Sequence, residues 1–309
     1  MTCSKLQLFN LVLLFFYYLP NVSSQGCCSG GTPISNHLNL NGSEKGKLFL
    51  RLNYDYNYLD DLIHKGDKIP NEDRNRITHS VLARVDYSIS DRINIGALIP
   101  WTKQIENIPQ NNFPDRTTQG LGDITLLGQV AILKKTRNQL FLATGVKFPN
   151  GKTDRVDEFS NLNFHPDLQP GSGTWDIMSI LQFNSLGIFS TKINFFANVN
   201  YRYVSSRQQF NNSQDYKFGN IWQSDVIFGR DFFLKNTLLS SSLGMQYRYY
   251  SADQINGFEA PNTGGMWSYF LVNQSISLLP NLQVSIGAEL PAFRKVDGLQ
   301  LTTSYRLIF

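Results

Sequence analysis

The segment GKLFLRLNYDYNYL, residues 46–59, alternates apolar and polar side chains along most of its length. One parity holds Leu48, Leu50, Leu52, Tyr54, Tyr56 and Tyr58, and the other holds Arg51, Asn53, Asp55 and Asn57. A period of two residues is that of a β-strand, whose side chains point alternately to its two faces. The segment therefore predicts a strand with one long apolar face and one face that carries ionisable groups.

The same alternation returns along the rest of the chain. Comparable segments lie near 77–89, 92–101, 121–133, 140–149, 174–184, 190–204, 220–233, 238–250, 266–278, 282–293 and 299–309. Each is about ten residues long, the length that crosses a bilayer when a strand is tilted. The last of them, GLQLTTSYRLIF with its leading glycine, ends on Phe309.

The connections between these segments alternate in length. Short ones lie at 90–91, 134–139, 184–189, 234–236 and 279–281, and long polar ones at 59–76, 102–120, 150–173, 204–219 and 251–265. The last connection of the second set, 294–298, is short. Alternating turns and loops are typical of outer-membrane barrels. We predict an all-β fold, a transmembrane antiparallel up-and-down β-barrel of about twelve strands (range about 10–14), with both termini on the periplasmic side of a bacterial cell outer membrane.

A soluble β-sandwich is the competing fold, because its strands alternate too. Strands in soluble proteins are usually shorter, with a mode of about five or six residues. The polar face also carries ionisable residues in mid-strand. Both features favour the barrel.

Composition agrees with a membrane surface. The chain has 309 residues and a net charge of +4, which is too small to indicate a nucleic-acid partner. Charged residues make up 17% and aromatic residues 13%. Residues 1–24 read as a cleaved signal peptide, with Lys5, an apolar run and a small-residue site before Gln25. Residues 25–46 then form a periplasmic segment and 47–309 the barrel, with neither a separate plug domain nor an energy-coupling domain expected.

Cys27 and Cys28 stand together in the periplasmic segment. Adjacent thiolates are weak candidates for a soft metal such as Cu(I). No histidine or methionine stands close by, so an oxidised pair or a tether is the simpler hypothesis. We expect no cofactor.

If the apolar face meets lipid, the ionisable side chains point inward. They line a wet channel, or they pair across the lumen and hold the wall together. The predicted lumen-lining residues are Arg51, Asp55, Arg84, Asp86, Arg92, Asp123, Lys147, Asp176, Lys192, Arg202, Asp225, Asp231, Arg248, Glu289 and Arg306.

Aromatic residues gather near the ends of the predicted strands. Interface girdles of this kind are common in membrane barrels, where one end of the ring is wet. A ligand-stacking track near the loops is the other possibility. Phe309 is expected to act as the signal that the barrel-assembly machinery reads, while the last strand pairs with the first.

Catalysis is not expected. His79 is the one histidine within a predicted strand, and Ser80 is its neighbour. Neighbours on a strand point to opposite faces, so Ser80 cannot be a nucleophile paired with His79. The Gly-rich stretches lack the strand–loop–helix setting of a phosphate site.

Four stretches carry a family resemblance, and they follow one another in order: YSISDRINIGALIPW (87–101), QGLGDITLLGQVAIL (119–133), LATGVKFPNGK (142–152) and LQPGSGTWDIMSILQF (168–183). The chain resembles the outer-membrane family known for a meta-cleavage pathway of phenol degradation, over roughly residues 77–309. Asn150 stands where that family usually has threonine. The resemblance implies a β-barrel and passage of small, aromatic compounds, without catalytic residues; it does not fix phenol as the substrate.

Together these features predict a channel or passive transporter for small, aromatic or hydrophobic molecules. Loops 59–76, 102–120 and 150–173 are expected to fold over its mouth. The alternative is a non-conducting barrel that acts as a binding or assembly partner through its periplasmic segment.

Overall fold

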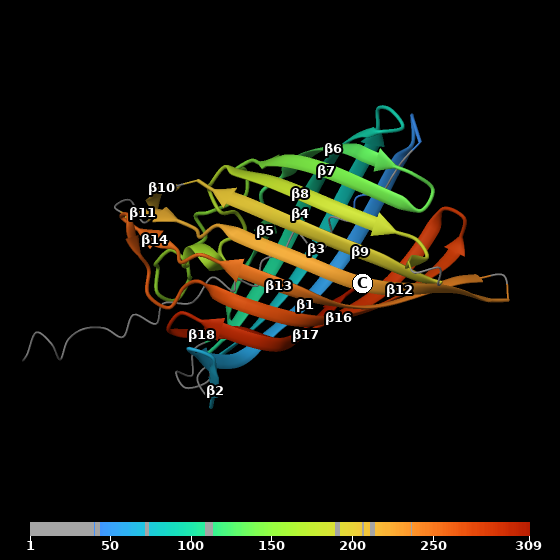
Figure 1. The fold of residues 1–309 in the computed structure, drawn as a ribbon. Coiled ribbons are helices and arrows are strands. Elements are labelled where there is room, and N and C mark those ends of the chain that lie inside the picture. Colours follow the sequence, from blue (N-terminus) through green and yellow to red (C-terminus); the bar gives the residue numbers. More distant parts are fainter. Residues whose placement is uncertain are drawn as a thin grey trace, which may run out of the picture.

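A computed structural model describes residues 40, 44–71, 74–108, 114–188, 192–205, 207–210 (backbone only), 214–235 and 237–309. Within these residues, twelve antiparallel strands form a closed barrel (Figure 1). They are β1 (Leu48–His64), β3 (Asn75–Ser88), β4 (Ile93–Asn107), β6 (Thr125–Lys134), β7 (Asn138–Lys147), β8 (Asp176–Ser185), β9 (Ile193–Val204), β12 (Ile221–Leu234), β13 (Thr237–Tyr250), β16 (Gly265–Leu279), β17 (Leu282–Val296) and β18 (Leu299–Ile308). The predicted all-β barrel is confirmed.

The last strand closes the barrel against the first. β18 pairs with β1 from Asp55↔Ile308 to His64↔Leu299. The backbone of Phe309 exchanges two hydrogen bonds with Tyr54, at 2.8 and 2.9 Å. Closure satisfies the backbone groups that an open sheet edge would leave unpaired in hydrocarbon.

The outer face is apolar, as the alternation predicts. Leu50 and Leu52 on β1 are 74% and 71% exposed, whereas Asp55 and Asn57 on the inward parity are 1% exposed. Large apolar side chains are exposed in the same way on the other barrel strands. A barrel surrounded by lipid requires this arrangement.

Several strands run past the predicted boundaries. β1 continues to His64 and β4 to Asn107, so much of 59–76 and 102–120 is strand rather than loop. The extensions pair with β2 (Asp67–Ile69) and β5 (Arg116–Leu121). The predicted loop boundaries were therefore wrong, because a polar strand beyond the membrane shows no apolar parity by which to recognise it.

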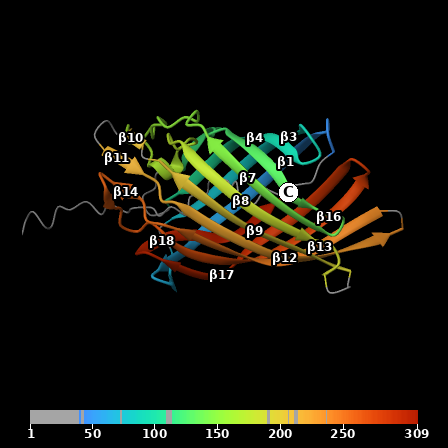
Figure 2. The ribbon, with the colours of Figure 1, turned by 45° about the horizontal axis from the view of Figure 1, so that its top comes forward.

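The long connections gather at one end of the barrel, which we call the loop end (Figures 1 and 2). There β10 (Arg207–Phe210), β11 (Gln214–Lys217), β14 (Gln254–Ile255) and β15 (Phe258–Glu259) make a small second sheet. A 3₁₀ turn, η3 (Pro166–Leu168), lies in the connection 148–175. The opposite end, with the short connections, is the turn end. No helix in the described ranges is long and apolar enough to cross a membrane.

Candidate functional site

The inward-facing charges of the wall are mostly held in ion pairs. Arg306 Nε lies 2.7 Å from Asp55 Oδ2 on the neighbouring strand β1. Glu289 on β17 lies 3.3 Å from Arg248 Nη2 and 3.9 Å from Arg306 Nη1. All four side chains are buried. Because buried ions are costly without partners, this group couples β18 to β1, β17 and β13.

A second group stands near the loop ends of β6, β7, β8 and β9. Lys147 Nζ lies 3.2 Å from Asp123 and 2.7 Å from Asp176. Arg202 adds a longer contact to Asp176 at 3.6 Å. Ser172 donates its backbone N–H to Asp123 at 2.8 Å. This lysine with two carboxylates thus joins the strand ends to the following loop.

Other predicted residues have different surroundings. Arg84 pairs with Asp86 at 2.7 Å on the same strand. Asp225 accepts hydrogen bonds from the amides of Asn198 at 2.8 Å and Gln223 at 3.2 Å. Arg51 is half-buried and lines an internal cavity. Amide donors thus satisfy the buried carboxylate of Asp225.

Three predicted lumen residues lie at the turn end. Lys192 and Arg92 are exposed in turns, immediately before β9 and β4 begin. Predicting these two residues as lumen-lining was therefore wrong, because parity was extended to positions where the strands have ended. Asp231 keeps the inward parity of Asp225 on β12, and it is exposed near the turn end, where Asn194 Nδ2 donates to it at 2.8 Å.

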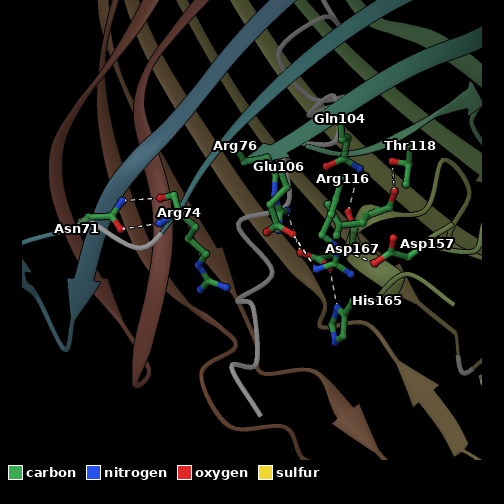
Figure 3. A network of polar contacts seen from close by, with 11 residues as sticks. Asn71, Arg74, Arg76, Gln104, Glu106, Arg116, Thr118, Asp157, His165 and Asp167 are labelled. Carbon is green, nitrogen blue, oxygen red and sulfur yellow. Dashed lines mark hydrogen bonds and ion pairs between the residues drawn. The ribbon is translucent and has the colours of Figure 1, made fainter. Parts of the chain in front are cut away.

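The structure adds a network that the sequence did not predict, at the loop end (Figure 3). Arg76 on β3 lies 2.9 Å from Asp167 of η3 and 3.3 Å from Glu106 on β4. Arg116 on β5 lies 3.2 Å from Glu106 and 3.1 Å from Asp157. The side chains of Arg76, Glu106 and Asp167 are at most 3% exposed. Figure 3 shows them converging from the wall and from the loop.

Neutral hydrogen bonds hold the same loop. Gln104 Nε2 donates to the Asp167 carbonyl at 3.0 Å, and Thr118 Oγ1 donates to the Leu168 carbonyl at 2.6 Å. The segment around η3 is therefore seated against β3, β4 and β5 and folds over the barrel mouth. Arg76 and Glu106 escaped prediction because they fell within predicted loops. Continuing the inward parity from Ser80 and Thr102 would have reached both.

The pKa values of two loop groups report their pairing. Burial lowers the pKa of His165, but the adjacent Asp167 carboxylate outweighs burial, so the pKa of His165 is raised. The two side chains meet at 2.6 Å. Burial acts to raise the pKa of Asp167, but Arg76 and His165 overcome it and hold the pKa well below its usual range. Both groups therefore favour their charged forms in the folded loop.

Glycines in the recognised motifs allow a close crossing of the loop. Gly151 and Gly171 touch, and a Cβ atom on Gly171 would lie 2.4 Å from the Gly151 carbonyl carbon. Asp123 Oδ1 accepts the Gly151 N–H at 2.9 Å. The motifs at 120–123, 148–151 and 171–173 thus build one junction between β6, β7 and the loop. These motifs have a structural role at the junction.

One wall of the lumen is apolar. The inward side chains of this wall form a single buried cluster, composed of Leu82, Leu98, Leu127, Ala131, Phe141, Ala143, Met178 and Ile180 together with Leu40. The Leu40 backbone is bound on both sides by Gln182, which donates to its carbonyl at 2.8 Å and accepts from its N–H at 2.9 Å. Leu40 belongs to the predicted periplasmic segment 25–46, but it lies inside the barrel.

The opposite wall borders a cavity of about 480 Å³. It occupies the turn-end half of the lumen, where β9, β12, β13, β16 and β17 contribute most of its lining. Its lining combines the charged Arg51, Asp225 and Glu289 with amide, hydroxyl and apolar side chains, including Asn53, Gln139, Asn198, Ile227, Leu271 and Asn273. The lumen thus offers hydrogen bonds and apolar contact in the same space.

The remaining sequence candidates have other surroundings. His79 Nδ1 lies 2.7 Å from Tyr54 Oη, and its ring stacks with Tyr54 and meets Tyr56 edge-on, whereas Ser80 is buried on the other face. Cys27 and Cys28 lie outside the described residues. Among the described residues, no group of three or more His, Cys, Asp or Glu side chains could hold a metal.

A comparison with a solved outer-membrane channel shows a barrel of the same fold. The COG4313 outer membrane channel from Pseudomonas putida F1 matches 86% of this chain and 94% of its own, at 17% identity and a TM-score of 0.69. The β domain of the Bordetella autotransporter BrkA matches 83% of this chain and 97% of its own, at 10% identity and a TM-score of 0.47. No curated protein matches the chain.

A family model agrees with the motifs described above. The model described as "Putative MetA-pathway of phenol degradation" matches residues 76–291, which is more than half of the chain. The matched region includes the glycine junction and the two walls of the lumen. The protein, a twelve-stranded barrel of the outer-membrane type, therefore belongs to this phenol-degradation family.

Proposed function

We propose that the protein is a passive outer-membrane channel or transporter for small molecules that have an apolar or aromatic part. The observation that carries this proposal is the lumenal cavity, whose lining combines apolar side chains such as Ile227 and Leu271 with amides and hydroxyls. An aromatic ring gains from burial against the apolar side chains, while its polar substituents keep hydrogen-bond partners among the polar ones. The name of the Pseudomonas putida F1 channel supports transport as the class of function.

Passage requires a path past the loop end and past Leu40. Arg76, Glu106 and Asp167 hold the loop over the mouth, and Leu40 occupies part of the lumen. Displacing the loop exposes three buried charges to water, which relieves their need for protein partners. We therefore propose that opening is a displacement of the loop around η3. The turn end, where β1 begins and β18 ends, is proposed to face the periplasm, as in other barrels with short periplasmic turns.

A non-conducting barrel that binds a partner is the second candidate. The pairing of wall charges favours it, because paired ions can hold a lumen closed. In that case the segment 25–46 would present the partner-binding surface, and Cys27 and Cys28 belong to it.

Reconstitution separates the two candidates. The full-length protein would be refolded into liposomes and planar bilayers, with heat-modifiable migration as the check on folding. We expect efflux of a fluorescent aromatic anion, naphthalene sulfonate, to exceed that of an uncharged sugar of similar size. Arg76→Ala should raise both fluxes by releasing the loop. A folded protein that stays silent to both solutes, with and without Arg76→Ala, would establish the non-conducting candidate instead.

A further inference from the structure

An open groove lies at the turn end of the barrel, beside the lumenal cavity. Its volume is about 560 Å³, and its lining is Arg137, Asn138, Ser185, Leu186, Gly187, Ile188, Phe195 and Phe228. These residues come from the turn before β7 and its first residue, from the end of β8 and the turn after it, from the beginning of β9 and from the middle of β12. The groove adjoins the lumenal cavity, since Arg137, Leu186 and Phe195 border both.

The membrane-facing side of the groove is aromatic. Phe195 and Phe228 are directly opposite in the β9–β12 register, with ring centroids 5.3 Å apart. Phe183 on β8 continues the row at 6.2 Å from Phe195. Phe228 is 47% exposed on the lipid face. The row offers an apolar surface about as wide as three strands, along which an acyl chain can lie.

The rim side of the groove is cationic. Arg137 lines it directly. Arg230 lies opposite Ile193 and two residues beyond Phe228, so its side chain shares the outer face with that ring. Lys192 is exposed immediately before β9. Within the described residues, none of these three cations has a carboxylate partner.

The carboxylates near this rim are engaged elsewhere. Asp231 is the neighbour of Arg230 on β12, but it points to the other face and binds Asn194 and Ser240. Asp91 accepts the Lys45 backbone N–H at 2.9 Å, and Glu44 pairs with Lys47 at 2.5 Å. The described part of the groove therefore presents positive charge above an apolar floor, without a compensating acid.

We propose that this groove binds an anionic phospholipid. The lipid phosphodiester would lie among Arg137, Lys192 and Arg230, and one acyl chain would follow Phe195 and Phe228. A guanidinium donates two parallel hydrogen bonds to phosphate oxygens, and juxtamembrane cations attract anionic lipid surfaces. The aromatic floor favours a lipid over free phosphate. The site is independent of whether the lumen conducts, and the proposed orientation places it at the periplasmic leaflet.

Native mass spectrometry of the full-length protein tests the proposal. The protein would be released from mixed micelles that contain equal amounts of palmitoyl-oleoyl phosphatidylglycerol and the matching phosphatidylcholine. The test variant is Arg137→Gln/Lys192→Gln/Arg230→Gln. The charge-matched control is Lys65→Gln/Lys152→Gln/Lys295→Gln at the loop end, where all three lysines are exposed.

We expect wild type and control to retain phosphatidylglycerol in preference to phosphatidylcholine, and the test variant to lose that preference. Dihexanoyl phosphatidylglycerol and inorganic phosphate, added to wild type as competitors, should both displace the long-chain lipid poorly. Equal retention of the two lipids by wild type would overturn the proposal. So would an equal loss in the control variant, or efficient displacement by inorganic phosphate, which would indicate an anion site without a lipid contribution. The lipid preference of the wild-type protein and its response to the competitors test the proposal even if the test variant does not fold.

Discussion

The two ends of the lumen use the same inward parity for different purposes. At the loop end, Arg76, Glu106 and Asp167 are buried and bind one another across β3, β4 and η3. At the turn end, amides such as Gln139 and Asn273 line a cavity of about 480 Å³. Buried charges draw the loop and the wall together because each charge requires a partner, whereas neutral amides can remain beside water in an open cavity. At the loop end the buried charges bind one another and close the lumen, whereas at the turn end amides accompany the charged Arg51, Asp225 and Glu289 around a cavity.

The largest expected effect comes from a substitution in the ion-pair network at the loop end. Arg76→Ala leaves Asp167 and Glu106 without their shared cation, and removing one partner of a buried pair costs about 3–5 kcal/mol. We expect a lower free energy of unfolding in urea and a larger conductance. Arg92→Ala, at an exposed turn-end position, is the control and should change stability by less than about 0.5 kcal/mol. Equal effects of the two substitutions would show that the loop-end network is not a closure.

Leu40 packs inside the barrel as part of the buried apolar cluster. Leu40→Ala removes most of a fully buried side chain, which costs about 2–5 kcal/mol of its packing. The N-terminal segment should then bind less firmly, and efflux of naphthalene sulfonate from liposomes should rise. Leu48→Ala, which alters a leucine 60% exposed to lipid, should leave efflux unchanged. Unchanged efflux in both variants would show that Leu40 does not obstruct the transport path.

The loop end should respond to pH and the turn end should not. The pKa of His165 is raised in the folded loop, so its stabilisation is complete below the unfolded value of about 6.5 and is lost as pH rises through the folded pKa. The pKa of Asp167 is lowered, so its contribution is present above about 3.9 and disappears only as pH falls through its folded pKa. The loop should therefore be most stable between about pH 3.9 and about pH 6.5.

Pulsed cysteine labelling measures that response. A cysteine at exposed Lys152 reports on the loop, and one at exposed Lys135 reports on the turn end. After correction for thiolate fraction, labelling at 152 should accelerate on raising the pH through the His165 transition. In His165→Gln that acceleration should disappear. The rate of labelling at position 135 should not change with pH in either protein. A pH response that survives His165→Gln would exclude the histidine as its origin.

The smallest effects are expected at the open end. Asn273→Ala and Gln139→Ala each shorten an amide beside the cavity, and such changes should alter stability by less than about 0.5 kcal/mol. The ratio of naphthalene sulfonate to sugar efflux should nevertheless shift toward the aromatic anion. Ser224→Ala on the other face of β12 is the control. An unchanged ratio would place selectivity outside this cavity.

The sequence by itself determined the barrel, the number of its strands and the direction of most wall side chains. Alternation at Leu48–Tyr58 and in the other segments is local, since each residue's face follows from its parity alone. The same logic placed Asp55, Lys147, Asp176 and Arg306 on the inner face. It failed for Lys192 and Arg92, because parity does not mark the residue at which a strand begins.

Only the tertiary structure decided which inward residues meet. Asp167 lies 91 residues from Arg76, and Gln182 lies 142 residues from Leu40. The periodicity of a strand contains no information about a loop that folds back over the barrel. The closed mouth, the apolar wall with Leu40 and the groove at Arg137 arise where distant segments pack. Their geometry depends on closure of the whole barrel, which fixes the distance between strands that no local pattern relates.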